Sequence, residues 1–240
     1  MIASTSTAGG GFFNGFERGD MDSLSLRQRL LGEYDSPLVG RSFRRKVTDY
    51  IEKRYLEEDG GYCFYRIPPS SGMDTYFAVK SLSILGLKPQ HPEAALRFML
   101  GQTKEDSTGG VTGVFATVEV IDELSQIPEG FRDYAQQRVL AIQNNAGGFG
   151  TLENFDIEVT SELQETYRAV RILKALDVHF DEEKVTHFVS GLLNADGGYG
   201  RDWRSTLAST FYATVIHKLL GKETREPTKT KGYLRSKENS

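Results

Sequence analysis

The 240-residue chain has a formal net charge of −4 and 38% hydrophobic residues, values typical of a soluble globular protein. The lack of a general basic field argues against nucleic-acid binding, and the lack of a long apolar run argues against a membrane span. The one cysteine, Cys63, excludes an internal disulfide and a cysteine-built zinc site, and it fits a reducing compartment. We therefore expect a cytoplasmic protein.

Three regions follow one another along the chain. Residues 1–22 are rich in Gly, Ser, Thr and Asp and lack helical periodicity, so we expect a disordered arm. Residues 23–221 form a repeat domain. Residues 222–240 are polar and basic and have no periodic apolar pattern. A disordered, solvated tail is the simplest interpretation of this last region, with an electrostatic contact as the alternative.

The repeat domain is marked by paired glycines. The pairs lie 49, 38 and 50 residues apart. A period in this range indicates stacked supersecondary units that can bury their apolar faces only against one another. The four pairs are Gly60-Gly61, Gly109-Gly110, Gly147-Gly148 and Gly197-Gly198.

Each glycine pair stands between two helices of a hairpin. The preceding helices are expected over residues 43–55, 93–100, 134–142 and 182–193. In the helices that follow, an apolar or aromatic residue recurs every three positions, which keeps these side chains on one stripe, although the fourth stripe is partly polar, with Thr214 and His217. The four stripes begin at Tyr76, Phe115, Tyr167 and Phe211. No segment is typical of a strand, so the sequence predicts an all-α protein of about four to five helical hairpins.

The boundaries of these helices also carry signals. Ser70, Ser161 and Ser205 occupy equivalent positions before the following helices and are predicted to cap them. Gly86 and Gly221 come directly after the last apolar residue of a stripe and are predicted to end the helix.

The glycine turns resemble those of a known family. Gly147-Gly148-Phe149-Gly150 and its later counterpart each precede a Ser/Thr-rich helix start and a Thr-aromatic pair. This combination resembles the prenyltransferase and squalene-cyclase repeat superfamily over about residues 43–221. The resemblance implies an α/α toroid, in which the helices after the glycine turns line a funnel. Complete rings of that family have six hairpins, so we expect a small or incomplete ring, with a partner subunit or a second copy completing it.

The resemblance also locates the metal site of that family. The zinc ligands of protein prenyltransferases fall on Gln164, Thr166 and Ser209, none of which is a zinc ligand of the expected type. Neither the Asp-x-Asp-Asp cluster of cyclases nor an Asp-Asp-x-x-Asp metal motif occurs in the chain, and the histidines show no metal-ligand spacing. We therefore expect no cofactor: zinc is disfavoured, and Mg²⁺ is the remaining option.

Two carboxylates and two arginines are the candidates for chemistry. Asp74 and Glu165 stand just before a Thr-Tyr pair, where a toroid would place them at the funnel mouth as acid or base. Stabilising a helix start is the competing explanation. Arg201 and Arg204 flank Trp203 and could clamp a diphosphate with its isoprenoid tail, or could tie the turn to the neighbouring hairpin.

Aromatic residues are the candidate lining of the cavity. Tyr76, Tyr167 and Phe211 at the inner helix starts, and Tyr199 in a turn, would contact an apolar ligand, although packing in the core explains the same pattern. The sequence predicts a prenyltransferase-like protein that handles an isoprenoid, either a prenyl diphosphate or a polyprene. The alternatives are a non-catalytic lipid- or peptide-binding interaction module and a terpene-cyclase-like enzyme. If the protein is an enzyme, we expect a transferase.

Overall fold

The computed structural model describes residues 41–105, 111–124, 127–150 and 159–238. Within these ranges every regular element is a helix, as the sequence predicts, and extended pairing is limited to isolated bridges at the glycine turns. The helices are α2 (Arg41–Glu52), α3 (Gly72–Ile84), α4 (Pro92–Glu105), α5 (Thr112–Leu124), α6 (Phe131–Leu140), α7 (Val159–Ala175), α8 (Glu182–Ser190), α9 (Leu207–Leu219) and α10 (Pro227–Ser236).

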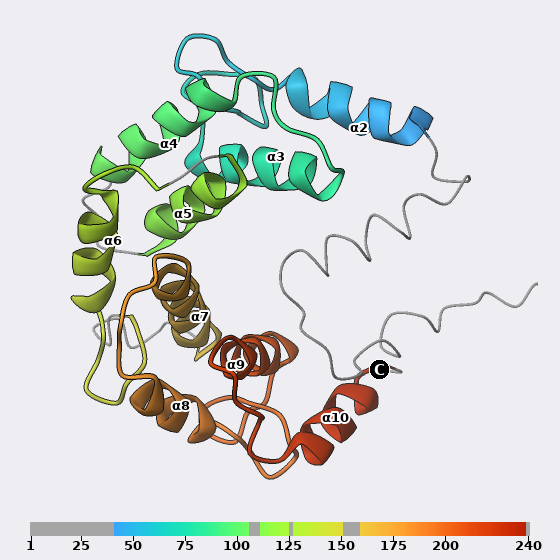
Figure 1. The fold of residues 1–240 in the computed structure, drawn as a ribbon. Helices are drawn as coiled ribbons and strands as arrows, with labels where there is room; N and C mark the ends of the chain where they lie inside the picture. Colours follow the sequence, from blue (N-terminus) through green and yellow to red (C-terminus); the bar gives the residue numbers. More distant parts are fainter. Residues whose placement is uncertain (1–40, 106–110, 125–126, 151–158, 239–240) are drawn as a thin grey trace, which may run out of the picture.

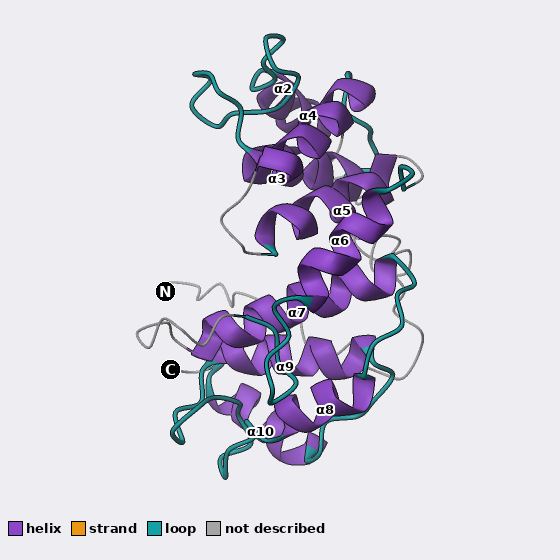
Figure 2. Ribbon diagram, turned by 90° about the vertical axis from the view of Figure 1, so that its left-hand side faces the viewer, coloured by secondary structure: helices purple, strands orange, loops and turns teal. Residues whose placement is uncertain are grey.

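The described helices form two concentric layers along an open arc (Figure 1). Helices α3, α5, α7 and α9 follow the glycine turns and make the inner layer, in which each packs on the next. Helices α4, α6, α8 and α10 lie outside them. Viewed from the side, the helices stack along the long dimension of the molecule, with loops at both edges (Figure 2). No helix in the described part of the chain is long and apolar enough to cross a bilayer.

The core lies between the two layers. One cluster of buried residues joins α5 through α9 and includes Phe149, Leu173 and Ile216; a second joins α2 through α5 and includes Leu82 and Met99. Leu82 and Leu173 are stripe residues, so the three-residue spacing predicts this packing face. The stripe aromatics behave differently, because several of them remain partly or largely exposed.

The paired glycines are required because the turn touches the next outer helix. Gly147 has φ of 104°, and a Cβ there would lie 2.5 Å from the carbonyl oxygen of Lys184. At Gly148 a Cβ would lie 2.6 Å from the ring of Phe188. The first glycine therefore supplies a left-handed backbone conformation, and the pair together allows the turn and the outer helix to approach closely.

The threonine of each Thr-aromatic pair fastens the turn to the inner helix. Its hydroxyl oxygen accepts a hydrogen bond from the backbone N–H of the aromatic residue in the turn. The three bonds are Tyr62 to Thr75 (2.9 Å), Phe149 to Thr166 (3.0 Å) and Tyr199 to Thr210 (3.0 Å). Since both partners are buried, the repeated threonine has a structural explanation in every unit where the turn is described.

The helix boundaries depart slightly from the prediction. Ser71 and Thr206 cap α3 and α9, one residue after the predicted Ser70 and Ser205. The hydroxyl of Ser205 donates to Asp196 (2.7 Å) instead, and Ser70 bonds Asp59 in the same way. The side chain of Ser161 lies outside the described residues. Gly86 and Gly221, with φ of 73° and 65°, end their helices as predicted.

The C-terminal segment differs from the expected disordered tail over 222–240, because residues 227–236 form α10. Pro227 suits the first turn of a helix, and Tyr233 and Thr230 are buried on one face. A Cβ at Gly198 would lie 2.9 Å from the Tyr233 ring, so α10 covers the last glycine turn as α8 covers the one before it. Only Thr230 and Tyr233 are buried in α10, and two positions are too few to show a helical periodicity in the sequence. The expected arm over 1–22 lies outside the described residues.

Candidate functional site

A row of six aromatic rings crosses the inner layer of helices. It starts on α3, passes over α5 and α7, and ends on α9. Neighbouring ring centroids lie between 5.0 and 5.9 Å apart, within the range of direct ring–ring contact. In order, the rings belong to Phe77, Tyr76, Phe115, Tyr167, Tyr212 and Phe211. The row therefore contains all four residues that begin the predicted stripes, among them Tyr76, Tyr167 and Phe211, together with two rings that the sequence does not single out, Phe77 and Tyr212.

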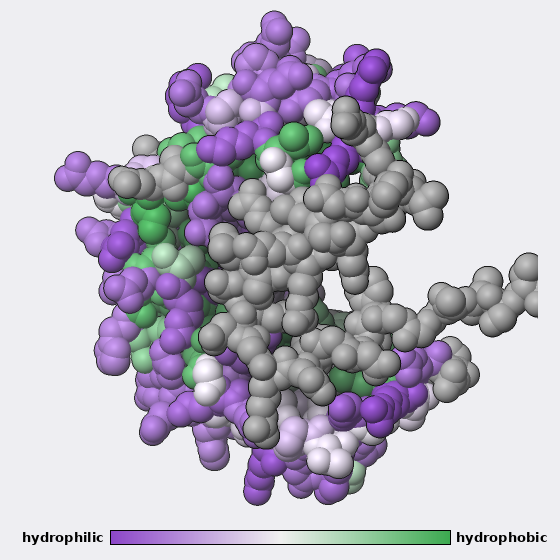
Figure 3. Space-filling view, turned by 45° about the vertical axis from the view of Figure 1, so that its right-hand side comes forward, coloured by the Kyte–Doolittle hydropathy of each residue, from purple (hydrophilic) through white to green (hydrophobic). Residues whose placement is uncertain are grey.

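The exposure of the aromatic row changes along its length. Phe115 is buried, whereas Phe77 and Phe211 at the two ends are 56% and 57% exposed. In the space-filling view, hydrophobic residues are visible between hydrophilic upper and lower parts of the molecule (Figure 3). Large exposed aromatic rings that continue a buried row are typical of a surface that receives an apolar partner.

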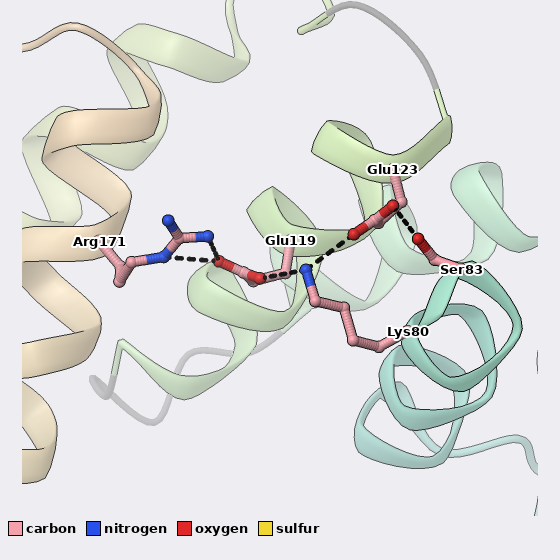
Figure 4. A network of polar contacts seen from close by, with 5 residues as sticks. All are labelled: Lys80, Ser83, Glu119, Glu123 and Arg171. Carbon is pink, nitrogen blue, oxygen red and sulfur yellow. Dashed lines mark hydrogen bonds and ion pairs between the residues drawn. The ribbon is translucent and has the colours of Figure 1, made fainter. Parts of the chain in front are cut away.

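A network of charges joins α3, α5 and α7 (Figure 4). Its members Lys80, Glu119 and Arg171 each stand four residues, about one helical turn, after a ring of the aromatic row. Glu119 on α5 is 4% exposed and accepts from Lys80 Nζ on α3 (2.8 Å) and from Arg171 Nε on α7 (3.0 Å). Lys80 also contacts Glu123 (2.8 Å), whose other oxygen accepts from the hydroxyl of Ser83. The network holds two cations and two carboxylates, so its formal charges cancel.

Burial and the charges of the network shift the pKa values of Lys80 and of two tyrosines in the aromatic row. Burial alone would lower the pKa of Lys80, but Glu119 and Glu123 outweigh it and raise that pKa, so the amine stays charged. Burial first, and then the charge of Glu119, raise the pKa of Tyr76. Burial likewise raises the pKa of Tyr167. Both phenols therefore stay neutral at physiological pH.

The two carboxylates predicted to act as acid or base are both engaged. Asp74 Oδ2 accepts from the backbone N–H of Phe64 (2.9 Å), which holds the loop before α3. Glu165 accepts from Arg168 Nη1 (2.5 Å), and the same nitrogen donates to Thr112 on α5 (2.7 Å). Asp74 lies in the first turn of α3, where a carboxylate stabilises the helix start. Glu165 lies well inside α7, which begins at Val159, so that structural explanation is wrong for Glu165. Asp74 and Glu165 stay predictions as catalytic groups.

The predicted binding residues in and after the last glycine turn are not members of the aromatic row. Arg201 pairs with Glu162 (2.7 Å), the first-turn carboxylate of α7. Trp203 is 88% exposed, and Arg204 is exposed beside it. Tyr199 is completely buried in the core, so its ring supports the turn rather than a surface. Of these residues only the exposed ones can meet a ligand directly.

The positions that correspond to the family's zinc ligands have other contacts. Thr166 is buried and holds the backbone N–H of Phe149, and Ser209 is buried at the start of α9, where Thr206 caps its N–H (2.9 Å). Among the described residues, no group of three or more His, Cys, Asp or Glu side chains is arranged to hold a metal ion.

A pocket of about 420 Å³ lies where α3 and α5 begin. Its walls combine hydroxyl, amide and apolar groups without a charged side chain. The residues that line it are Ser71, Gly72, Met73, Met99, Gln102, Thr112, Gly113, Ala116 and Thr117. The pocket therefore offers shape and neutral hydrogen-bonding groups, and no charge to bind an anion.

The charged network was missed in the sequence, although a signal for it exists. Lys80, Glu119 and Arg171 each stand four residues after the first ring of their stripe, so they occupy the same repeat position with alternating sign. Residues spaced by four lie on one helix face. Comparing the repeat units position by position for charge would have found the network.

Comparison with known proteins agrees with this architecture. The family model described as the prenyltransferase alpha-alpha toroid domain matches the chain over residues 28–119 and 110–240. These matches together cover every helix of the described ranges, including α10. No curated protein matches the chain.

Proposed function

Because this chain belongs to the prenyltransferase α/α-toroid family, we propose that its concave face binds an isoprenoid chain along the aromatic row. The observation that carries the proposal is the unbroken line of six rings from Phe77 to Phe211 across four helices. Transferring an apolar chain from water onto such a surface is favourable by about 0.8 kcal/mol for each CH₂ that becomes fully buried.

The electrostatics of the site favour an uncharged ligand over a diphosphate. The cations nearest the row already have carboxylate partners: Lys80 and Arg171 share Glu119, and Arg168 pairs with Glu165. A diphosphate would have to compete with these buried pairs, at a cost in desolvation and in broken hydrogen bonds. A polyprene or a prenyl alcohol avoids that competition.

A prenyl diphosphate is the second candidate ligand, and it rests on the loop after the last glycine turn. Arg204 is exposed there, and Arg201 is more exposed in its pair with Glu162 than Lys80 and Arg171 are in theirs. These two arginines would neutralise a phosphate, and Trp203 would lie against the isoprenoid chain. Catalysis has less support than binding, because Asp74 and Glu165 both hold neighbouring elements in place. We therefore favour a binding protein over a transferase.

Thermal-shift titration with geranylgeraniol and with geranylgeranyl diphosphate tests the proposal. A ligand at one hundred times its dissociation constant stabilises the folded state by about 2.7 kcal/mol. We expect the alcohol to raise Tm. The double variant Phe77→Ser and Phe211→Ser should lose most of that shift while remaining folded, because both side chains are more than half exposed.

Tyr65→Ser is the matched control, because Tyr65 is 76% exposed and outside the aromatic row. It should keep the full shift. If only the diphosphate raises Tm, and Arg204→Ala removes that effect, the second candidate ligand replaces the first. An equal shift in the double variant and the control would overturn binding along the row.

A further inference from the structure

The loop before α9 presents a tryptophan in an unfavourable backbone conformation. Thr206 N–H donates to Tyr199 C=O (3.2 Å) and Arg204 N–H donates to Arg201 C=O (2.9 Å), which closes a tight hairpin. The two residues at its tip, Asp202 and Trp203, have φ of 52° and 58°. Turns of this primed type strongly prefer glycine or asparagine at the tip, and a bulky residue there is strained.

Nothing in the described fold offsets the strain at Trp203, because its side chain is 88% exposed. An aromatic ring that is held out in water on a rigid turn gains its stabilisation only from a partner. Strained residues that are kept by the surrounding structure are a feature of functional sites.

The base of this hairpin is fixed on α10. A Cβ at Gly197 would lie 2.4 Å from the carbonyl of Lys229, and one at Gly198 would lie 2.5 Å from Ser205 and 2.9 Å from Tyr233. The loop that carries Trp203 and the C-terminal helix are therefore parts of one packed unit, at the end of the arc where α9 and α10 lie (Figure 1).

This end of the molecule is cationic. Residues 222–238 contain six Lys or Arg and three Glu, a net charge of +3 in a chain whose total is −4. Thr230 and Tyr233 point into the fold, which leaves Lys231 and Arg235 exposed one turn apart on α10. In the hairpin itself, exposed Asp202 on one side of Trp203 offsets exposed Arg204 on the other, so the positive charge of this end comes from the C-terminal segment. The surface is thus complementary to a negatively charged partner.

An apolar strip connects this surface to the aromatic row. Leu207 and Phe211, 52% and 57% exposed, stand one turn apart on α9, directly after the hairpin. The ring of Phe211 contacts that of Tyr212 at a centroid distance of 5.3 Å, and Tyr212 belongs to the row. Exposed apolar groups thus run from the hairpin into the concave face.

We propose that the Trp203 hairpin and α10 dock onto an anionic membrane surface. Trp203 enters the boundary between headgroups and acyl chains, the preferred place of tryptophan in a bilayer, and the basic side chains lie over the anionic headgroups. Leu207 and Phe211 then face the acyl chains and connect them with the aromatic row. Docking explains together the exposed strained tryptophan, the local positive charge and the apolar strip.

The fluorescence of the full chain tests docking directly, because Trp203 is its only tryptophan. Vesicles of phosphatidylcholine with phosphatidylserine should shift the emission to shorter wavelength in a saturable way, and brominated acyl chains should quench it. Vesicles of phosphatidylcholine alone should do neither, and added salt should reverse the effect. An unshifted spectrum with the anionic vesicles overturns the proposal.

Sedimentation with the same vesicles tests the residues. The variants Trp203→Ser and Lys231→Glu with Arg235→Glu should each lower the partition coefficient by about tenfold or more. The matched control is Lys88→Glu with Arg132→Glu, which makes the same charge change at exposed positions on other elements and should bind as the wild type does. Equal loss in the control would show a general charge effect and overturn the assignment of this surface.

Two further outcomes separate this inference from its competitors. If polyglutamate binds through Lys231 and Arg235 while anionic vesicles do not, the surface meets an acidic protein and the membrane proposal is wrong. The geranylgeraniol thermal shift is measured without vesicles, so its failure bears on the aromatic row alone. The Lys231→Glu and Arg235→Glu variant should retain that shift.

Discussion

At the scale of single residues, His217 and Tyr199 form an unusual pair in the core. Both are buried, with ring centroids 6.2 Å apart, and neither the Tyr199 hydroxyl nor either His217 nitrogen has a hydrogen-bond partner in the described structure. In the first unit the equivalent tyrosine, Tyr62, donates to Glu52 (3.1 Å), and the equivalent of His217 is Leu82. At these two positions the last unit thus carries buried polar atoms without a partner, where the first unit has a hydrogen-bonded tyrosine and a leucine.

This pair makes stability depend on pH. Burial lowers the pKa of His217 below its usual value of 6.5, so the unfolded chain binds the proton more readily than the folded one. Its contribution to folding is complete above pH 6.5 and is lost as the pH falls below it, by at most about 1.4 kcal/mol for each pH unit. Urea unfolding at several pH values should show this slope in the wild type and a flatter one in His217→Leu. Parallel slopes would remove His217 as the cause.

At the scale of elements, the charged network ties three inner helices through one carboxylate. Glu119 on α5 is the only group in the drawn network that contacts both α3, through Lys80, and α7, through Arg171 (Figure 4). Removing its charge leaves two cations that are about one-quarter exposed without their shared partner. Breaking a buried pair in this way is costly even where the intact pair adds little net stability.

We expect Glu119→Gln to lower the free energy of unfolding by about 2–4 kcal/mol, measured by urea denaturation. Glu182→Gln is the matched control, because Glu182 pairs with Lys174 and both side chains are 37% exposed. That change should cost less than about 1 kcal/mol. Equal losses in the free energy of unfolding for the two substitutions would mean that burial of the network does not increase the cost of removing a carboxylate.

The sequence predicts features that depend on residues close together in the chain better than contacts between residues far apart in the chain. The helices were predictable because stripe residues such as Leu82 and Leu173 repeat within one turn of each other. Contacts between elements were not: Glu119 and Arg171 are polar residues 52 positions apart, and each alone is typical of a solvated helix face. The partners of Asp74 and Arg201 were hidden for the same reason. The sequence therefore predicted which aromatic residues belong to the candidate site, and the structure showed how their rings are arranged in a row.

At the scale of the whole molecule, the described arc ends on a helix that covers it. Terminal units of stacked repeats need a polar outer face, and α10 supplies one, with Tyr233 5% exposed beneath basic side chains. At this end the arc is capped by its own chain. The partner subunit or second copy expected from the sequence stays a prediction.

Truncation after Lys222 should therefore destabilise the last unit. Removing Tyr233 from its buried place costs about 3–5 kcal/mol, the range for deleting a large aromatic side chain from a core. Hydrogen exchange should then show lost protection in α9. Truncation after Ser236, which keeps all of α10, is the control and should leave α9 protected. If α9 kept its protection in the chain truncated after Lys222, the segment would behave as the solvated tail that the sequence predicts.

The aromatic row crosses the helices instead of following one of them. Each inner helix contributes one or two rings, so no single unit contains the site. In a stack of repeats, stability is shared mainly between nearest neighbours, and one end can open while the other stays closed. A ligand that lies along the whole row would link the first unit to the last, and its binding energy would be lost if either opened. Such a ligand would couple the four hairpins, so that they would unfold together as one cooperative unit.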